Sequence, residues 1–373
     1  MNSARQVLMN PGPVLVDERV RQAMSGPDLC HREPEFAALM TRVSAGLTQV
    51  CGGGASCASV VFSGSGTAAL EATLSSVVPA EGGILILANG HYGERLEEIA
   101  AVHGIRRRVL RFGWAGAFDL AAIADALREE TALTHVAMVH HETSTGMLNP
   151  LREVGRIASA QGRSLMVDAI SSVGGEILDM SADCIDWCVG TANKCLEGLP
   201  GLSFVCAPRA RLEALSGIPA RTYYLDLHRQ CVATNVLQAP PFTPAVQTFY
   251  ALDAALDLML AEGVPARHAR YAALAAQLRD GLANLGFRFL LPPEHRSASL
   301  TAVYLPEGAS YAELHDGLKN RGFVIYAAQQ TLSARVFRLA NMGQMQPGDI
   351  ARFLEVLPQV LSDVAARRNR SGQ

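Results

Sequence analysis

Lysine is almost absent from this sequence. The 373 residues contain two lysines, Lys194 and Lys319, and arginine supplies the other permanently charged basic side chains. An ammonium group can lose its proton when it is desolvated and can then react with a carbonyl, whereas a guanidinium stays charged. Lys194 follows the apolar run DWCVG in a segment rich in small residues and glycine. A surface lysine on a turn would explain it, but so would a lysine kept for carbonyl chemistry.

Long apolar runs and blocks of one charge are absent too. No stretch is apolar enough to span a bilayer, and the N-terminus lacks the apolar core of a signal peptide. The formal net charge is -3, with both signs interspersed. These features argue against a membrane or nucleic-acid partner and predict a cytoplasmic protein.

Paired metal-binding cysteine motifs are also missing. The chain has eight cysteines, but neither Cys51 and Cys57 nor Cys184 and Cys188 have the spacing of paired CxxC zinc ligands. We therefore expect no metal site, and we interpret the cysteines as reduced and mostly buried.

Strand-like and helix-like segments alternate from about residue 58. Apolar runs such as VVFSG, GGILILANG, THVAMVHHE, SLMVDAISS, CIDWCVG and GLSFVCAP are separated mostly by amphipathic segments. Continuous apolar strands between such helices predict an α/β fold with a mainly parallel central sheet that is covered on both faces by helices. Ligands of such sheets bind at the carboxyl ends of the strands.

The pattern of predicted helices and strands changes after QAPPFTP. A long helical region spans about 246–285, and shorter strands and helices follow it. We therefore predict a large domain over 18–245 and a smaller C-terminal α+β domain over 246–373, with residues 1–17 forming an N-terminal segment near the active site.

The segment FSGSGTAALEA places Ser65, Gly66 and Thr67 between a strand and a helix. Backbone N–H groups and the helix dipole favour an anion at such a turn, most often a phosphate. The pattern also matches the looser dinucleotide fingerprint G-x-G-x-x-A, but the next strand ends in Ala-Asn-Gly at 88–90 and lacks the acidic residue that a ribose requires. A single phosphate is therefore favoured over a dinucleotide, and a plain tight turn is the remaining alternative.

Asp168 ends the apolar strand of LMVDAISS, and Lys194 follows the next strand. A buried aspartate requires a partner, which could be a helix N-terminus, an ion-pair partner or a protonated ring nitrogen. Pyridoxal phosphate enzymes pair the ring nitrogen with an acid and hold the cofactor's aldehyde on a lysine. The two side chains would lie at the same edge of the sheet.

Two further strand ends carry suitable groups. Tyr92 in NGHYG could stack on a flat heterocycle, and Thr143 in HHETSTG could donate a hydrogen bond to a ring hydroxyl. Each alone could equally be a packing tyrosine or a capping hydroxyl. A phosphate cradle, a stacker, an acid and a lysine at four strand ends together predict a pyridoxal phosphate site.

The order of the segments GSGT, NGHYG, HHETSTGMLNP, VDAISSVGG, NKCLEGLPG and FRLANMG resembles the class V aminotransferases of fold type I. The resemblance extends from NPGP at 10–13 almost to the C-terminus. Within the class, MVHHETSTGMLNP, VDAISSVGG and NKCLEGLPG are most similar to the branch that transfers the amine of 2-aminoethylphosphonate to pyruvate.

The resemblance implies a role for each matching residue. Lys194 would carry the cofactor aldehyde and move the substrate proton, and Asp168 would face the ring nitrogen. The implied cofactor-binding residues are Ser65, Gly66, Thr67, Tyr92, Thr143, Asp168, Asn193, Lys194 and Thr243. Thr243 would reach the phosphate of a neighbouring subunit, which implies a homodimer with shared active sites. Arg338 would hold an acid group of the substrate by a two-pronged contact.

One segment departs from the aminophosphonate pattern. HREPEF at 31–36 is more similar to alanine–glyoxylate and serine–glyoxylate aminotransferases, and these activities are the main alternative. His31 and Arg32 could add positive charge near the substrate, or the segment could simply begin a helix. A cysteine desulfurase would require a catalytic cysteine in the C-terminal part, whereas the last cysteine here is Cys231. A regulator without turnover would require a DNA-binding module, for which neither terminus has room.

Overall fold

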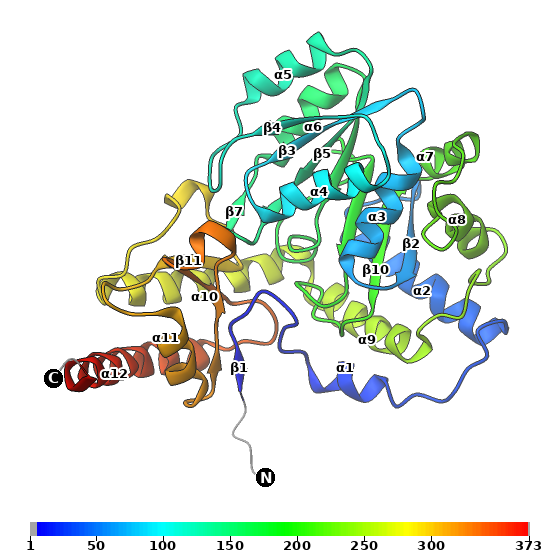
Figure 1. Cartoon of the computed structure of the whole chain (residues 1–373). Coiled ribbons are helices and arrows are strands. Elements are labelled where there is room, and N and C mark those ends of the chain that lie inside the picture. Colours follow the sequence, from blue (N-terminus) through cyan, green and yellow to red (C-terminus); the bar gives the residue numbers. More distant parts are fainter. Residues whose placement is uncertain (1–5, 372–373) are drawn as a thin grey trace.

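The computed structural model describes residues 6–371, and its largest sheet has seven strands (Figure 1). Their order across the sheet is β2 (Cys57–Ser63), β10 (Leu202–Pro208), β9 (Trp187–Thr191), β8 (Ser164–Asp168), β5 (Leu133–Val139), β3 (Gly83–Ala88) and β4 (Arg107–Arg111). Neighbouring strands run parallel, except that β10 is antiparallel to both β9 and β2. The prediction of a mainly parallel sheet is confirmed.

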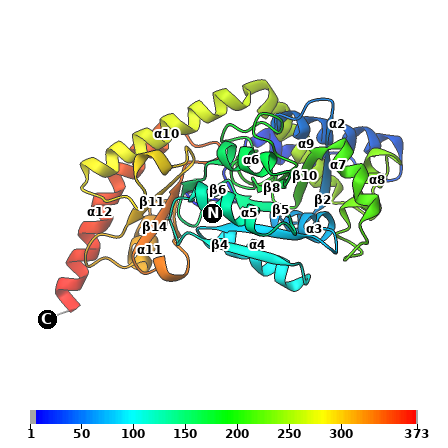
Figure 2. The ribbon, with the colours of Figure 1, turned by 90° about the horizontal axis from the view of Figure 1, so that it is seen from above.

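Helices cover both faces of this sheet (Figures 1 and 2). One face packs against α3 (Gly66–Val77), α4 (His91–Val102), α7 (Arg209–Ala214) and α8 (Leu227–Asn235). The other face packs against α2 (Pro34–Val50), α5 (Leu120–Glu129), α6 (Leu151–Ala160) and α9 (Val246–Glu262). In β3, Ile84 and Ile86 belong to the first core and Leu85 and Leu87 to the second, because successive side chains of a strand point to opposite faces.

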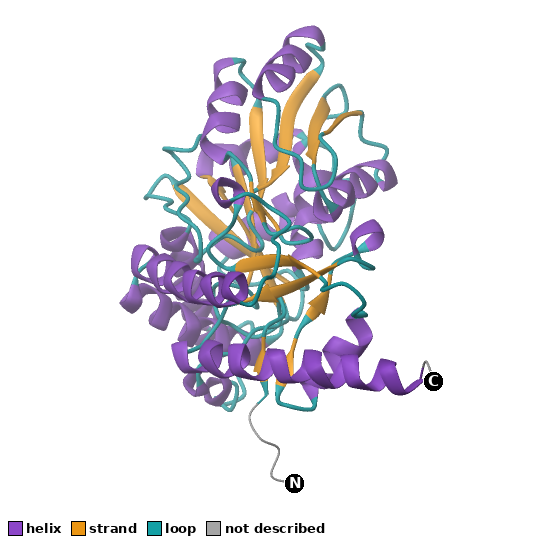
Figure 3. Cartoon of the chain, turned by 90° about the vertical axis from the view of Figure 1, so that its left-hand side faces the viewer, coloured by secondary structure: helices purple, strands orange, loops and turns teal. Residues whose placement is uncertain are grey.

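A smaller body lies beside the large sheet. Its antiparallel sheet has the order β11 (Leu300–Tyr304), β14 (Val336–Ala340) and β13 (Tyr326–Ala327). The helices α10 (Val264–Asn284), α11 (Tyr311–Lys319) and α12 (Pro347–Ser371) pack with it, and Figure 3 shows the helix that ends at the C-terminus running past the smaller group of strands. The short elements are β1 (Val7–Leu8) paired with β12 (Phe323–Val324), β6 (His141–Glu142) paired with β7 (Met147–Leu148), α1 (Glu18–Ala23), and the 3-10 turns η1 (Leu215–Gly217), η2 (Pro293–His295) and η3 (Gln330–Leu332).

The helical region predicted over 246–285 consists of two helices, α9 and α10. They are separated at Gly263, whose φ of +82° is the left-handed conformation that glycine adopts readily. α9 packs against α2 in the core of the large sheet, whereas α10 continues to α12 in the smaller body. The domain division at residue 245 stays a prediction.

The N-terminal segment pairs with the small body and reaches the turn after β9 of the large sheet at Pro11. Met9 accepts a backbone hydrogen bond from Ala340 through its carbonyl, and Leu15 forms a bridge with Gly343. The eight cysteines carry free thiols. Among the helices of residues 6–371, none is long and apolar enough to cross a membrane.

Candidate active site

A cavity of about 160 Å³ lies at the edge of the large sheet where the parallel strands end. Seven residues expected from the sequence line it, namely Ser65, Gly66, Thr67, Tyr92, Asp168, Asn193 and Lys194. The rest of the lining comes from Arg95, Val139, His141, Ile170, Ser171 and Thr191. The segments that the sequence placed at separate strand ends therefore meet at one site.

Lys194 lies in the turn that follows β9. Its Nζ donates a hydrogen bond to the carbonyl oxygen of Pro11 in the N-terminal segment. Burial lowers the pKa of Lys194 from 10.5 to about 8, and the positive charges of Arg338 and Arg95 act in the same direction. Near neutral pH, a usable fraction of this amine is uncharged.

Asp168 ends β8, and its side chain is buried. Oδ1 accepts a hydrogen bond of 3.0 Å from the backbone N–H of Ile170. Burial raises the pKa of Asp168 to about 7, against the opposing effect of that hydrogen bond and of the nearby positive charges of Arg95 and Lys194. A carboxyl group that is buried in this way stays ionised only beside a positive partner, such as a protonated ring nitrogen.

Ser65, Gly66 and Thr67 form the turn from β2 into α3. Ser65 is the N-cap of the helix and makes no capping hydrogen bond through its side chain. A Cβ on Gly66 would lie 2.5 Å from Cδ1 of Ile170, so a larger residue there would push the Ile170 side chain, which lines the cavity, out of its place. The N-terminus of α3 therefore faces the cavity as a site for an anion.

Tyr92 lies in the first turn of α4 and is held by a buried carboxylate that the sequence analysis did not single out. Oε2 of Glu142 accepts hydrogen bonds from the backbone N–H groups of Tyr92 (3.0 Å) and Gly93 (3.1 Å). Oε1 accepts from the N–H (3.1 Å) and Oγ (2.5 Å) of Ser144. Glu142 thus fixes the start of α4 to the loop after β5. The signal that was available is its position directly before Thr143.

Arg95 is a second residue of the site that was missed. Its guanidinium lies 4.7 Å from the centre of the Tyr92 ring, and Nη1 donates to Oγ1 of Thr67 at 3.3 Å. Arg95 follows Tyr92 by three positions on α4, a spacing that places both side chains on one side of the helix. It adds a positive charge beside the anion site.

Arg338 and Thr143 meet beside the cavity without lining it. Arg338 is buried on β14, and its Nη1 donates to the carbonyl oxygen of Thr143 while its Nε donates to that of Ala327, both at 2.9 Å. A guanidinium has five N–H groups, so Nη1 and Nη2 keep donors for a further two-pronged contact. Within the part of the chain that the structure describes, Oγ1 of Thr143 is buried without a hydrogen-bond partner.

Thr243 and Arg32 lie away from the cavity within one chain. Thr243 is exposed in the turn before α9. Arg32 is exposed and lines a surface hollow of about 470 Å³ with Tyr223, Leu237 and Phe242. Glu33 is the N-cap of α2 and Pro34 its first residue, so HREPEF does begin a helix.

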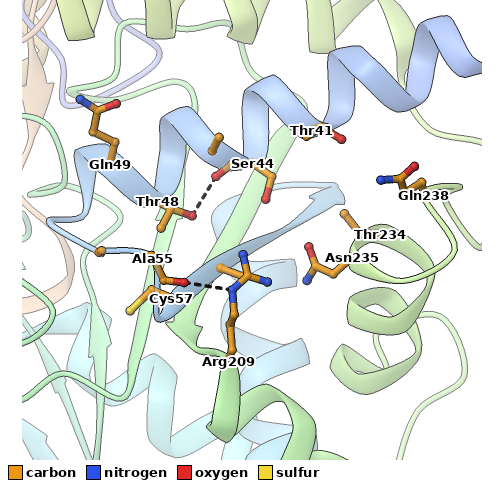
Figure 4. A pocket seen from close by; sticks show the side chains of 14 residues that line it. Thr41, Ser44, Thr48, Gln49, Ala55, Cys57, Arg209, Thr234, Asn235 and Gln238 are labelled. Atoms are coloured by element: carbon orange, nitrogen blue, oxygen red, sulfur yellow. Dashed lines mark hydrogen bonds between the residues drawn. The ribbon is translucent and has the colours of Figure 1, made fainter.

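A roomier cavity of about 360 Å³ lies at the opposite edge of the sheet, where β2 begins and β10 ends. Figure 4 shows Arg209 in it, between Ser44 and Thr48 on α2 and Asn235 on α8. Nε of Arg209 donates to the carbonyl oxygen of Ala55 at 3.2 Å. None of the predicted site residues lines this cavity, so its size does not make it the active site.

The residues around the first cavity fit the parts of pyridoxal phosphate. The turn at 65–67 would hold the phosphate, Asp168 the ring nitrogen and Lys194 the aldehyde. Among the described residues, Oγ1 of Thr143 and Nε2 of His141 are buried polar atoms that no protein group satisfies. Such atoms are rare unless a ligand or water completes their hydrogen bonds; His141 lines the cavity, whereas Thr143 lies beside it and next to Arg338.

Comparison with known proteins gives a consistent picture. The model of the family "Aminotransferase class-V" matches residues 24–345. The 2-aminoethylphosphonate–pyruvate transaminase of Vibrio cholerae is 38% identical over 364 residues, which cover 95% of this chain and 97% of the relative. The transaminase of the same description from Syntrophobacter fumaroxidans is 36% identical over 353 residues, 94% of each chain.

Solved structures share the whole architecture. Ureidoglycine–glyoxylate aminotransferase from Bacillus subtilis superposes with a TM-score of 0.92 at 27% identity, covering 98% of this chain and 95% of that chain. Alanine–glyoxylate aminotransferase from Nostoc sp. superposes with a TM-score of 0.90 at 28% identity, covering 97% and 96%. The fold type I architecture predicted from the sequence is confirmed.

Proposed function

Because this chain belongs to the class V aminotransferases, we propose that it transfers the amino group of 2-aminoethylphosphonate to pyruvate, which gives phosphonoacetaldehyde and alanine. The relatives with this activity match the chain over almost its whole length. The observation that carries the proposal is the single cavity that holds Lys194 and Asp168 together with the turn at 65–67.

The cofactor is pyridoxal phosphate, which when bound supplies an aldehyde that takes up the donor's amine and a ring that accepts an electron pair. Among the residues of the site, Lys194 is the one whose Nζ takes up and releases the proton of the substrate. With a pKa of about 8 it can accept the proton of the donor carbon as a neutral amine and release it again. The Asp168 carboxylate keeps a proton on the ring nitrogen, which it can do because burial leaves it in need of a positive partner.

Arg338 is the proposed anchor for the acid group that both substrates carry. It is the buried guanidinium at the junction of the small body and the loop after β5, and its contact with the Thr143 carbonyl fixes its direction. Since 2-aminoethylphosphonate and pyruvate each present one anionic group, a single guanidinium can serve both halves of the reaction in turn.

Alanine–glyoxylate or serine–glyoxylate transamination is the second candidate. The HREPEF segment favours it, and so does the superposition on glyoxylate-using enzymes. Those structures are 27–28% identical to this chain, whereas the aminophosphonate relatives reach 36–38%. We therefore rank the aminophosphonate reaction first.

We also propose that the protein is a cytoplasmic homodimer with shared active sites. Thr243 is exposed on its own chain, and the segment that precedes it exposes Tyr223, Val236 and Leu237, with exposed fractions of 67–70%. A group of large apolar side chains on the surface is typical of an interface. Covering it with a second copy would place Thr243, and Arg32 beside the same surface, near the partner's site.

A donor screen tests the proposed function. 2-Aminoethylphosphonate, alanine, serine and phosphonoalanine are each offered with pyruvate and with glyoxylate, and the oxo product is measured. We expect 2-aminoethylphosphonate with pyruvate to give the highest kcat/KM. Faster turnover of alanine or serine with glyoxylate would replace the proposal by the second candidate.

A further inference from the structure

We infer that Glu197 is a positioning residue, which ties the turn carrying Lys194 to α10 and to the turn between β14 and α12, and so sets the place of the Lys194 amine. The inference rests on the proposed role of Lys194. It concerns a buried acid outside the cavity, three positions beyond the lysine.

The backbone of Glu197 is held in an unusual conformation. Its N–H donates to the carbonyl oxygen of Lys194 at 2.9 Å, which closes the turn. Its φ is +59°, a left-handed value that a residue with a Cβ rarely adopts. Such a residue persists only where its surroundings fix it, and strained residues of this kind concentrate at functional sites.

The Glu197 side chain supplies that fixation. The residue is 3% exposed. Its carboxylate accepts hydrogen bonds from Nη2 of Arg270 (2.9 Å), Oη of Tyr271 (2.7 Å) and Nε2 of Gln344 (2.5 Å). Arg270 and Tyr271 lie on α10, which runs from the end of α9 beside the large sheet to the small body (Figure 2).

The same partners lead back to the other end of Lys194. Oη of Tyr271 accepts from the N–H of Gly343, and Nη1 of Arg270 donates to the carbonyl oxygen of Gly343, both at 3.0 Å. The N–H of Gln344 donates to the carbonyl oxygen of Leu15 at 2.9 Å. Leu15 belongs to the N-terminal segment whose Pro11 accepts from Lys194. Glu197 closes the backbone turn of Lys194. Through α10 and the turn at 343–344, it is also linked to the N-terminal segment that binds Nζ of Lys194.

Glu262 provides a matched comparison. It forms ion pairs with two arginines of α10 that also lie near Glu197, with Oε1 2.7 Å from Nε of Arg270 and Oε2 2.7 Å from Nε of Arg267. Nη2 of Arg267 lies 3.9 Å from Oε2 of Glu197. Glu262 lies at the end of α9, and its carboxylate accepts hydrogen bonds from these two arginines. Its link to the turn at 194–197 is therefore indirect, through Nη1 of Arg267, which donates to the carbonyl oxygen of Cys195 at 3.0 Å. A purely structural ion-pair network would respond alike to the loss of either acid.

The experiment uses the scarcity of lysine. The full-length chain, stripped of cofactor, is treated with a trace amine-acylating reagent over a range of pH, and modification of Lys194 is measured by mass spectrometry with Lys319 as the internal reference. In Glu197→Gln, we expect the turn to loosen and admit water, which raises the apparent pKa of Lys194 by about one unit. We expect kcat of the holoenzyme to fall about 10-fold to 100-fold, because the amine is misplaced. Glu262→Gln should leave both measurements close to wild type.

An unchanged Lys194 titration in Glu197→Gln, or the same change in Glu262→Gln, would overturn the inference. If Glu197→Gln does not fold, Tyr271→Phe removes one hydrogen bond to Glu197 and must shift the titration in the same direction. The labelling does not require turnover. An inactive wild-type chain with the expected labelling would therefore count against the proposed function and not against the role of Glu197.

Discussion

Gly12 and Lys194 are in direct contact, although they lie far apart in the sequence. A Cβ on Gly12 would stand 2.7 Å from Cδ of Lys194 and 3.1 Å from its Nζ, and the φ of Gly12 is +115°. The N-terminal segment therefore forms one wall around the reactive amine, and it can do so only with glycine at this position.

We expect Gly12→Ala to displace the lysine. The added methyl group meets a flexible side chain, which must move away, and the backbone is strained at that φ. A displacement of about 1 Å at a reacting group can lower kcat about 100-fold, and steady-state kinetics measures the loss. Gly348→Ala is the control, because a Cβ there meets nothing within 4 Å. Similar kinetics for both variants would contradict the contact.

Covalent labelling by reduction tests whether Lys194 holds the cofactor. Borohydride reduction of the holoenzyme should fix pyridoxal phosphate covalently to the peptide that contains Lys194, because its amine carries the cofactor aldehyde. Peptide mass spectrometry locates the label. Lys319→Arg, at the exposed end of α11, should be labelled like wild type. Label on Lys319, or none, would disprove the assignment.

Asp168→Asn should bind the cofactor and lose most of its turnover. An amide cannot favour a proton on the ring nitrogen as a carboxylate does, so we expect kcat to fall by at least about 100-fold, the lower range for losing a group that acts in proton transfer. Absorbance of the bound cofactor and the rate of each half-reaction are the measurements. A near-native rate would remove Asp168 from the mechanism.

The same substitution should change how the stability of the cofactor-free chain depends on pH. The pKa of Asp168 is about 7 in the folded chain and near 3.8 in the unfolded chain. Asp168 therefore contributes to the free energy of unfolding at low pH. This contribution, about 4 kcal/mol, is lost as the pH rises from about 4 to about 7. Asp168→Asn should be the more stable protein at pH 8 but not at pH 4 in urea unfolding. Asp280→Asn, exposed on α10, should show no such trend.

Arg338→Lys should weaken both half-reactions. Lysine keeps the charge but cannot reproduce a planar two-pronged contact or the hydrogen bonds to the carbonyls of Thr143 and Ala327. We expect kcat/KM for both the amino donor and pyruvate to fall roughly 30-fold or more, equivalent to about 2 kcal/mol. Arg335→Lys, exposed on the same segment, is the control. A loss confined to one substrate would show that the other is anchored elsewhere.

Shared active sites predict complementation. Lys194→Ala and Thr243→Trp should each be inactive alone. If Thr243 serves the neighbouring subunit, a mixed dimer contains one site with both native residues, so an equal mixture that has dissociated and re-associated should recover about a quarter of wild-type activity. Activity after mixing, with sedimentation to confirm the dimer, is the measurement. An active monomer would exclude shared sites.

The sheet and the meeting of Asp168 with Lys194 could be predicted because both depend on local patterns. Continuous apolar runs indicate strands that are covered on both faces, and the carboxyl ends of adjacent parallel strands share one edge. The contact between Gly12 and Lys194 could not be predicted, since it depends on how the small body holds the N-terminal segment. The break between α9 and α10 does have a local signal, since glycine and proline, here Gly263 and Pro265, interrupt or begin helices. Glu197 gave no local signal, for its partners come from two distant segments.

The place of β10 in the sheet has a consequence for synthesis on the ribosome. β2 is an edge strand whose one neighbour in the sheet is β10, and that pairing involves residues 202–208. The strand that leads into the turn at 65–67 therefore has no partner until more than half of the chain has been made. Because domains acquire their structure as the chain emerges, β3, β5, β8 and β9 can assemble first, and the anion site closes last. A nascent chain should be unable to retain its cofactor before β10 has emerged.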